Sequence, residues 1–238
     1  MSALASDTAM ILAAGLGKRM RPLTASQPKP MVRVAGKPLI DHALDKLRDA
    51  GISRAVVNVH YMADALEAHL TERKNPAVVI SDEREQLLET GGGLVKALPL
   101  LPDPFFSVNS DNIWLDGPFD AFRELSEAWD PHKMDALLLL VPHTGAFNYR
   151  GKGDFGMDPL GRISRRRSGR IAPFIFSGIQ LVSHRLLRDA PDGPFSTNLL
   201  WDRAIDEVRL YGLCFAGEWF EVGDPAAIAP TEAALRRG

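Results

Sequence analysis

Residues 12–24 read L-A-A-G-L-G-K-R-M-R-P-L-T. The apolar run before Gly15 predicts a buried strand, and Gly15 and Gly17 then let the backbone turn tightly, because neither carries a Cβ. Backbone N–H groups in such a turn can approach an anion closely. Arg19 and the nearby Lys29 add a planar guanidinium and a mobile ammonium, which suit phosphate oxygens in different ways. The stretch therefore predicts a polyphosphate-binding loop at the end of a strand.

Two better-known phosphate loops do not fit this stretch. The P-loop motif G-x-x-x-x-G-K-[ST] fails because Arg19 follows Lys18, and the dinucleotide motif G-x-G-x-x-G fails at Met20. An NAD-binding oxidoreductase would need that third glycine and an acidic partner for the ribose. The remaining alternative is a tight turn with solvated charges, but the combination of Arg19, Pro22 and Lys29 favours polyphosphate binding.

The motif also resembles a known family. L-A-A-G-x-G-x-R-M-x-P-L-T, followed by P-K-P-M and G-K-P-L-I, is similar to the signature of the sugar-1-phosphate nucleotidylyltransferases. Further landmarks are E-T-G-G-G at residues 89–93, N-S-D-N at 109–112 and W-F-E-V-G-D-P at 219–225, so the resemblance covers nearly the whole chain. It implies a Rossmann-like nucleotidyltransferase fold and an enzyme that exchanges the pyrophosphate of a nucleoside triphosphate for a sugar 1-phosphate. No hexapeptide repeat follows, so the β-helix of bifunctional relatives is not expected.

The pattern along the chain predicts an α/β fold. Short runs rich in β-branched or aromatic residues alternate with helical patterns in the first half, which indicates parallel strands. These strands are expected at residues 10–14, 55–59, 77–80 and 105–108, with helices at 39–50, 63–70 and 119–129. After residue 135, strands predominate at 136–141, 162–165, 174–182 and 208–215, and a last helix is expected at 225–237. We therefore expect a mixed, mostly parallel central sheet flanked by helices.

Length and composition point to one small-molecule enzyme domain. The 238 residues suit a single domain, with a nucleotide-binding part at about 8–115 and a sugar-binding part at about 116–238. Lys and Arg total 28 against 30 Asp and Glu, so no basic field indicates nucleic acid. Cys214 is the only cysteine, lies in an apolar run and is expected to fill the core. No signal peptide or membrane-spanning stretch is evident, which makes the cytoplasm the default location. The oligomeric state is not predicted.

Two carboxylates are candidates for a Mg²⁺ site. Asp111 follows a predicted strand at the sheet edge where ligands of open α/β folds bind, and Asp224 follows the strand-like run at 219–222. Two carboxylates can hold a Mg²⁺ that also binds waters and phosphate oxygens. The alternative for each is a turn or helix cap, with Pro225 favouring a cap at Asp224. The resemblance assigns both to the metal.

The resemblance also implies roles around the nucleotide. Arg19 is expected to grip the leaving pyrophosphate and Lys29 to bridge the α-phosphate and the sugar phosphate, so no protein nucleophile is required. The remaining nucleotide-binding candidates are Leu12, Ala13, Ala14, Gly15, Gly17, Lys18, Glu89, Gly91 and Asn109. Lys18 could instead be a solvated loop charge, and Gly91 a flexible helix entry.

Sugar recognition is expected from the second half of the chain. Its candidates are Asn112, Asn148, Asp154, Asn198 and Arg166. Many family members carry a Glu-Lys-Pro stretch where this chain reads I-S-R-R-R-S-G-R at residues 163–170, and an arginine there could meet a sugar carboxylate. The alternative is a solvated basic loop, because strand alternation sends Arg165 and Arg167 away from Arg166.

The overall pattern most resembles uridylyltransferases that use UTP and N-acetylmuramate 1-phosphate in cell-wall recycling. Guanylyltransferases for mannose or heptose 1-phosphate and thymidylyltransferases for glucose 1-phosphate are the alternatives within the family. An inactive nucleotide-sugar sensor is an alternative of another class. Retention of Arg19, Lys29, Asp111 and Asp224 together argues against a sensor.

Overall fold

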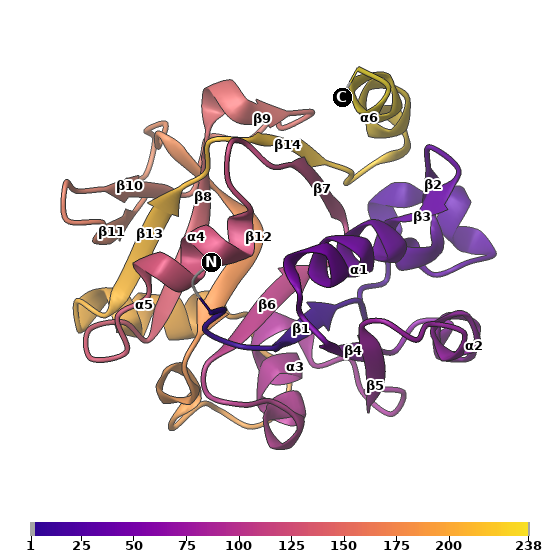
Figure 1. The fold of residues 1–238 in the computed structure, drawn as a ribbon, viewed down its shortest axis with the longest axis horizontal. Coiled ribbons are helices and arrows are strands. Elements are labelled where there is room, and N and C mark those ends of the chain that lie inside the picture. Colours follow the sequence, from indigo (N-terminus) through magenta and orange to yellow (C-terminus); the bar gives the residue numbers. More distant parts are fainter. Residues whose placement is uncertain (1–2, 238) are drawn as a thin grey trace.

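A nine-stranded mixed sheet forms the centre of the computed structural model, which describes residues 3–237 (Figure 1). Its main order is β11-β10-β12-β6-β1-β4-β5, and β8 pairs with both β12 and β13. The strands are β1 (Thr8–Leu12), β4 (Arg54–Val59), β5 (Ala77–Asp82), β6 (Phe105–Asn109), β8 (Ala136–Pro142), β10 (Phe155–Met157), β11 (Ile163–Arg165), β12 (Phe174–Val182) and β13 (Leu210–Cys214).

Parallel pairing is concentrated in the first half of the chain. β1 lies between β4 and β6 and runs parallel to both, with Met10 opposite Val56 on one side and Ser107 on the other. β5 is parallel to β4, whereas β12 is antiparallel to β6 and to β8, and β13 is parallel to β8. Because β1, β4 and β6 are parallel, their carboxyl ends meet at one edge of the sheet. The predicted α/β class with a mixed sheet is confirmed.

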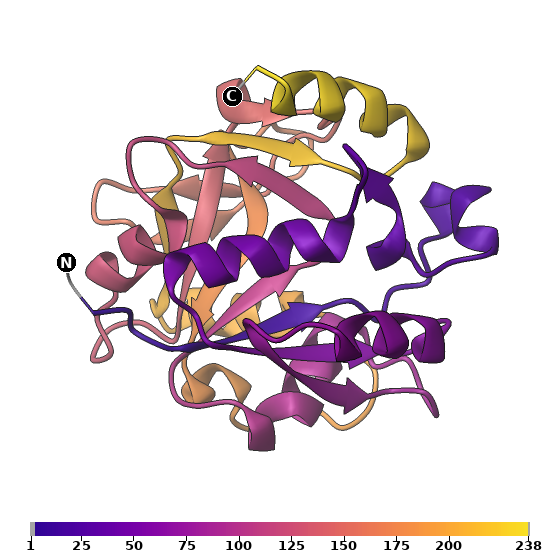
Figure 2. The ribbon, with the colours of Figure 1, turned by 45° about the vertical axis from the view of Figure 1, so that its right-hand side comes forward.

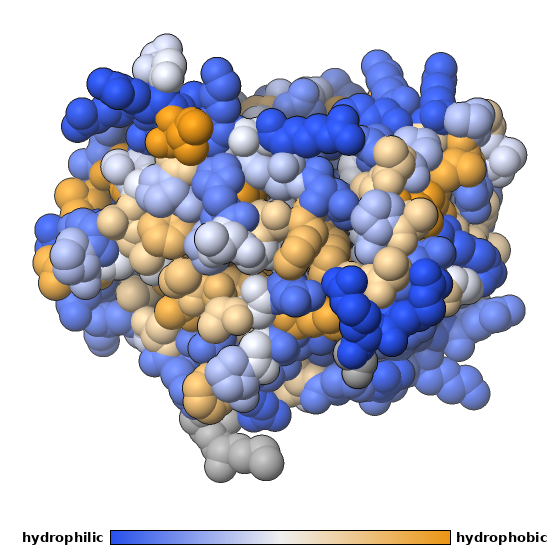
Figure 3. Space-filling view, turned by 90° about the horizontal axis from the view of Figure 1, so that it is seen from above, coloured by the Kyte–Doolittle hydropathy of each residue, from blue (hydrophilic) through white to orange (hydrophobic). Residues whose placement is uncertain are grey.

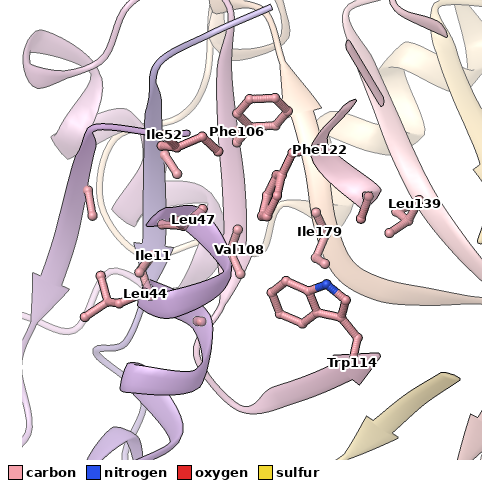
Figure 4. Close-up of a cluster of buried hydrophobic side chains, with 14 of the residues drawn as sticks. Ile11, Leu44, Leu47, Ile52, Phe106, Val108, Trp114, Phe122, Leu139 and Ile179 are labelled. Atoms are coloured by element: carbon pink, nitrogen blue, oxygen red, sulfur yellow. The ribbon is translucent and has the colours of Figure 1, made fainter. Parts of the chain in front are cut away.

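Helices cover both faces of the sheet. They are α1 (Leu39–Ala50), α2 (Ala63–Thr71), α3 (Glu89–Ala97), α4 (Ala121–Ala128), α5 (Asn198–Asp206) and α6 (Ile228–Leu235). Side chains alternate across β1, so that Ile11 packs with α1, α2 and α4 while Met10 packs with α3 and α5. Figure 4 shows the first layer, where Leu44 and Leu47 of α1 lie against the sheet.

A small second sheet brings distant segments together. β7 (Asn112–Leu115) pairs with β14 (Glu218–Glu221), which pairs in turn with β9 (Ala146–Phe147). Figure 2 shows β7 and β14 side by side next to α1, with α6 beyond them. A two-stranded sheet, β2 (Arg33–Val34) with β3 (Lys37–Pro38), precedes α1. The small sheet places residues 219–224 beside the chain that follows β6.

Several local expectations differ from the structure. Cys214 is exposed at the end of β13, because alternation turns the neighbouring Phe215 into the core instead, so its predicted role as core filler is wrong. Helices α3 and α5 were not predicted. The expected last helix begins as a 3₁₀ turn at Pro225–Ala227 and continues as α6.

The surface carries only scattered apolar side chains. On the face seen in Figure 3, hydrophilic side chains surround a central area of paler and more hydrophobic ones. The large hydrophobic residues exposed over half or more of their area are Phe119, Leu160, Ile171 and Leu199. No helix within residues 3–237 is long and apolar enough to cross a membrane.

Candidate active site

The loop after β1 is held between its two neighbouring strands. The backbone N–H of Ala13 donates to Oδ1 of Asn58 in β4 (2.6 Å), and the N–H of Ser110, after β6, donates to the carbonyl of Leu12 (3.2 Å). Both bonds join residues far apart in the sequence. The exit of β1 is therefore oriented before any ligand binds, at the sheet edge where open α/β folds bind ligands.

Gly15 and Gly17 serve different purposes in this loop. Gly17 has φ of 58°, and a Cβ there would lie 2.9 Å from Cβ of Lys29 and 3.0 Å from Cγ2 of Thr24, so the protein itself requires glycine. A Cβ on Gly15 would meet no protein atom within 4 Å. Gly15 lines a cavity, so the absence of its side chain leaves space for a ligand and is not required by packing within the protein.

This first cavity has a volume of about 550 Å³ and lies at the carboxyl ends of β1 and β6. Eleven of the predicted residues line it: Leu12, Ala13, Ala14, Gly15, Gly17, Lys18, Arg19, Lys29, Glu89, Asn109 and Asp111. Thr90, Ser196 and Gly223 line it as well. The volume suits a small molecule, and the exposed loop backbone with three cations suits phosphates.

Lys29 and Asp111 form the closest charged pair in this cavity. Nζ of Lys29 lies 2.6 Å from Oδ2 of Asp111, and the Lys29 side chain is only 12% exposed. Asp111 thus holds an ammonium group, which would otherwise be mobile, beside the loop after β6. In this position Lys29 can offer its other N–H groups to a phosphate.

Arg19 lines the same cavity. Its guanidinium packs against Gly223, where a Cβ would come within 3.0 Å of Nη1, and Nη1 lies 3.5 Å from Oε1 of Glu221. The Arg19 side chain is 68% exposed, so most of its donors face the cavity or solvent. The absence of a side chain at Gly223 lets the Arg19 guanidinium lie against this backbone.

Asp224 caps the helical turn that follows it. Its Oδ1 accepts from the N–H of Ala227 (3.2 Å), with Pro225 in the first turn, which is the cap expected from the sequence. Asp224 does not line the first cavity, although its neighbour Gly223 does. The N–H of Val222 donates to the carbonyl of Asp111 (3.2 Å), so the segment leading to Asp224 runs beside Asp111.

Of the two carboxylates, only Asp111 lines the cavity, where it could serve a magnesium ion that takes its other ligands from water and phosphate. Mg²⁺ is commonly bound through one or two protein carboxylates together with substrate phosphates. Within residues 3–237, no group of three or more His, Cys, Asp or Glu side chains forms a complete metal cage. The Asp111 side chain lines the cavity and is 30% exposed; its Oδ2 accepts from Lys29, whereas its Oδ1 makes no hydrogen bond within residues 3–237.

A buried carboxylate supports the loop from behind. Glu83 is fully buried; its Oε1 accepts from Nδ2 of Asn58 (2.8 Å) and its Oε2 from the N–H of Leu88 (3.2 Å). Burial raises the pKa of the Glu83 carboxyl above its ordinary value, while these two hydrogen bonds act in the opposite direction. Glu83 thereby orients Asn58, whose other amide atom holds Ala13.

The glycines at the start of α3 permit close packing. A Cβ on Gly91 would lie 2.3 Å from Cε2 of Phe195, and the Gly91 N–H donates to the Phe195 carbonyl (2.8 Å). A Cβ on Gly93 would lie 2.9 Å from Oε1 of Glu83. Gly91 was predicted to bind the nucleotide, but it lines neither cavity and instead joins α3 to the segment before α5.

A second cavity of about 360 Å³ adjoins the first. The residues common to both are Leu12, Arg19, Thr90, Asn109, Asp111 and Ser196. Three predicted sugar-binding residues line the second cavity: Asn112, Asp154 and Asn198. Each is held by a hydrogen bond. Nδ2 of Asn112 donates to the carbonyl of Ser177 (2.9 Å), Oδ2 of Asp154 accepts from the N–H of Phe176 (2.9 Å), and Nδ2 of Asn198 donates to Oγ of Ser196 (3.0 Å). The shared wall lets two ligands meet near Arg19 and Asp111.

Arg165, rather than the predicted Arg166, lines the second cavity. Arg165 shares the face of β11 with the buried Ile163, and this face points toward α5. Arg166 begins the following loop, where its side chain donates to the carbonyls of Gly153 (3.0 Å) and Arg170 (3.2 Å). The expected alternation of side chains is present, but it directs the neighbouring arginine toward the cavity.

Asn148 also lies outside both cavities, contrary to its predicted role in sugar binding. Its Nδ2 donates to Oγ1 of Thr231 (3.0 Å) and to the carbonyl of Ala227 (3.4 Å), so it fastens β9 to the start of α6. The next residue, Tyr149, does line the second cavity. Burial, together with the nearby Asp154 carboxylate, raises the pKa of the Tyr149 phenol.

Several residues of this region were not predicted from the sequence. They are Asn58 and Glu83, which support the loop, and Tyr149, Gln180, Trp201, Trp219 and Glu221 around the second cavity. Asn58 and Gln180 had a usable signal, because each is a buried polar residue inside an otherwise apolar strand. The aromatic residues had none, since core packing accounts for them equally well.

Comparison with known proteins agrees with this arrangement. The family model described as "Nucleotidyl transferase" matches residues 8–149, more than half of the chain. The chain belongs to the nucleotidyl transferase family. The resemblance indicated by the loop motif is therefore confirmed.

Two curated relatives of this nucleotidyl transferase share nearly its whole length. N-acetylmuramate alpha-1-phosphate uridylyltransferase of Caulobacter vibrioides is 46% identical over 97% of this chain and 98% of its own. The protein of the same name from Neisseria meningitidis is 33% identical over 94% and 96%. A solved structure of UDP-glucose pyrophosphorylase complexed with UDP-glucose has a TM-score of 0.81 at 12% identity, covering 98% of this chain and 99% of that one, which shows a common fold.

Proposed function

We propose that this protein transfers the uridylyl group of UTP to N-acetylmuramate α-1-phosphate, forming UDP-N-acetylmuramate and pyrophosphate. The observation that carries the proposal is the 46% identity, over 97% of the chain, with the Caulobacter enzyme named for that activity. Two adjoining cavities that share Arg19 and Asp111 support a reaction between two bound substrates. We place the triphosphate and base in the first cavity and the sugar in the second.

The chemistry we propose is in-line displacement at the α-phosphorus of UTP. A phosphate oxygen of the sugar phosphate forms the new P–O bond while the bond to the β-phosphate breaks, and the electron pair leaves with pyrophosphate. The protein binds and orients these groups and neutralises their charge. Arg19 grips the leaving pyrophosphate, Lys29 bridges the two reacting phosphates, and the backbone of residues 13–18 holds the triphosphate.

We further propose that Asp111 and Asp224 hold Mg²⁺ together with substrate phosphates. The bound ion would supply charge neutralisation on the phosphate oxygens. Asp111 also keeps Lys29 in place at 2.6 Å, so its carboxylate contributes to the site in two ways. The cap at Asp224 is compatible with this role, since only Oδ1 accepts from Ala227.

We propose that the reaction belongs to the recovery of cell-wall sugars. UDP-N-acetylmuramate is an activated form of a peptidoglycan sugar, and a preceding reaction that forms a sugar 1-phosphate must supply the acceptor. We propose that this takes place in the cytoplasm, where nucleoside triphosphates are available.

A matrix of nucleoside triphosphates and sugar 1-phosphates, scored by pyrophosphate release and by chromatography of the nucleotide sugar, tests the proposal. The highest kcat/KM is expected for UTP with N-acetylmuramate α-1-phosphate. A preference for GTP with mannose 1-phosphate, or for dTTP with glucose 1-phosphate, would contradict it. Binding of these ligands without release of pyrophosphate by the folded protein would indicate a sensor instead.

A further inference from the structure

A cationic corner of the second cavity has no role in the chemistry described so far. It consists of Arg165 at the end of β11 and Thr197 and Asn198 at the start of α5. The Arg165 guanidinium lies over the rings of Phe155 and Trp201, with Cζ 4.9 and 5.7 Å from their centroids. These contacts fix the plane of the guanidinium.

Hydrogen bonds fix the direction of the guanidinium as well. Nε donates to Asp202 (2.6 Å), Nη1 to Oδ1 of Asn198 (2.9 Å) and Nη2 to the carbonyl of Asn198 (3.0 Å). Each terminal nitrogen keeps one N–H that makes no hydrogen bond within residues 3–237. Such an N–H on a guanidinium whose plane and direction are both fixed can make a charge-assisted hydrogen bond to a carboxylate.

Thr197 provides an independent indication of a ligand. The residue is 3% exposed and lines the second cavity, yet its Oγ1 is buried and has no hydrogen-bond partner in the described structure. An unpaired buried hydroxyl carries a desolvation cost, and a ligand that accepts its hydrogen bond removes that cost. Thr197 and Asn198 both line this cavity at the start of α5.

The balance of charges in the second cavity makes Arg165 important for the binding of an acidic ligand. The charged residues that line this cavity are Arg19, Arg165, Asp111, Asp154 and Glu221. Arg19 already lies near Glu221, and the acidic groups outnumber the basic ones. Without Arg165 the wall would repel a carboxylate, whereas Asp202, which pairs with Arg165, does not line the cavity.

We propose that Arg165, with Thr197 and Asn198, binds the lactyl carboxylate of the sugar substrate and so selects an acidic acceptor. This inference rests on the proposed function, because it takes N-acetylmuramate 1-phosphate as the acceptor. The lactyl carboxylate is the group that distinguishes this sugar from N-acetylglucosamine. Arg165 acts on selectivity, whereas Arg19, Lys29 and Asp111 act on the phosphates common to all substrates.

A comparison of two acceptors, one with a charged and one with a neutral lactyl group, tests the proposal. The substrates are N-acetylmuramate 1-phosphate and its lactyl amide, which keeps the phosphate and nearly the same shape but lacks the lactyl charge. We expect the wild-type protein to prefer the acid by about tenfold to a hundredfold in kcat/KM, and Arg165→Gln to bring that ratio close to one. Arg167→Gln, which removes an equal charge from the exposed part of the same loop, should keep the wild-type ratio.

A second variant separates binding from folding. Thr197→Val removes the unpaired hydroxyl at nearly constant volume, so the variant should be at least as stable as the wild type while its KM for the acid rises several-fold. Equal losses of Arg165→Gln on acid and amide would overturn the proposal and assign Arg165 to holding α5. A wild-type protein that uses acid and amide equally would also overturn it, with the proposed function intact. Failure of the wild type to use either sugar would instead overturn the proposed function.

Discussion

The two cavities are built in different ways. The longest continuous part of the first cavity's lining is residues 12–19, whose backbone is held by Asn58 from β4 and by Ser110 after β6. The second is lined by side chains from β7, β10, β11, β12, α5 and β14, which come together only in the folded molecule. The first arrangement presents backbone groups that few substitutions can alter. The second can change its ligand through single side chains, while the phosphate chemistry stays the same.

The largest effect should follow from a change at the wall that both cavities share. Asp111→Asn removes the charge that holds Lys29 at 2.6 Å and the proposed metal ligand, so kcat should fall on the order of a thousandfold for every sugar substrate. Circular dichroism should report an intact fold, and Asp130→Asn, at a partly exposed position outside both cavities, should retain activity. A loss confined to one sugar would contradict the common role of this wall.

A smaller loss should follow from a change of cation in the first cavity. Arg19→Lys keeps the charge but removes the planar pair of donors, so kcat/KM should fall by about tenfold to a hundredfold with either acid or amide acceptor. Arg21→Lys, at an exposed position outside both cavities, serves as the control. Steady-state kinetics with varied UTP would measure the effect, and a loss no larger than that of the control would place Arg19 among the solvated surface charges.

The two loop glycines should separate ligand binding from folding. Gly15→Ala enters open space, so the free energy of unfolding should hardly change, while KM for UTP should rise by about tenfold if the triphosphate uses that space. Gly17→Ala should lower the free energy of unfolding by about 1–3 kcal/mol, because the residue has a positive φ and crowds Lys29 and Thr24. Urea titrations and UTP kinetics on both variants would reveal a reversed order if this assignment is wrong.

The smallest effect should come from the support behind the loop. Because burial raises the pKa of Glu83 in the folded state, the wild type should lose stability as pH rises from about 4.3 toward that raised value. Glu83→Gln cannot ionise and should lose about 1 kcal/mol through one mismatched hydrogen bond, with the deficit largest at acidic pH and smaller at pH 7.5. Urea unfolding at pH 4.5 and 7.5 measures the difference, and a deficit that grows with pH would contradict the direction of the pKa shift.

How much could be predicted differs between the two cavities. Eleven of the site residues predicted from the sequence line the first cavity. Most of them belong to the loop after β1, which appears in the sequence as one contiguous motif. Gly91 and Asn148 were assigned from their neighbourhood in the sequence, and both instead connect elements of the fold. Asp111 and Asp224 were recognisable as strand-end carboxylates, but the bond from Asp111 to Lys29 was not.

The sequence by itself determined the α/β class, the parallel core and the phosphate loop, since these depend on periodicity and on residues adjacent in the chain. Only the tertiary structure decided which arginine of residues 165–167 lines the second cavity, because the short β11 takes its orientation from packing against β10 and α5. It also decided that Glu83 and Asn58 support the loop, since their contacts with Leu88 and Ala13 depend on how β4, β5 and β1 lie together. Side-chain direction on a short edge strand is set by its neighbours, and sequence spacing alone does not specify them.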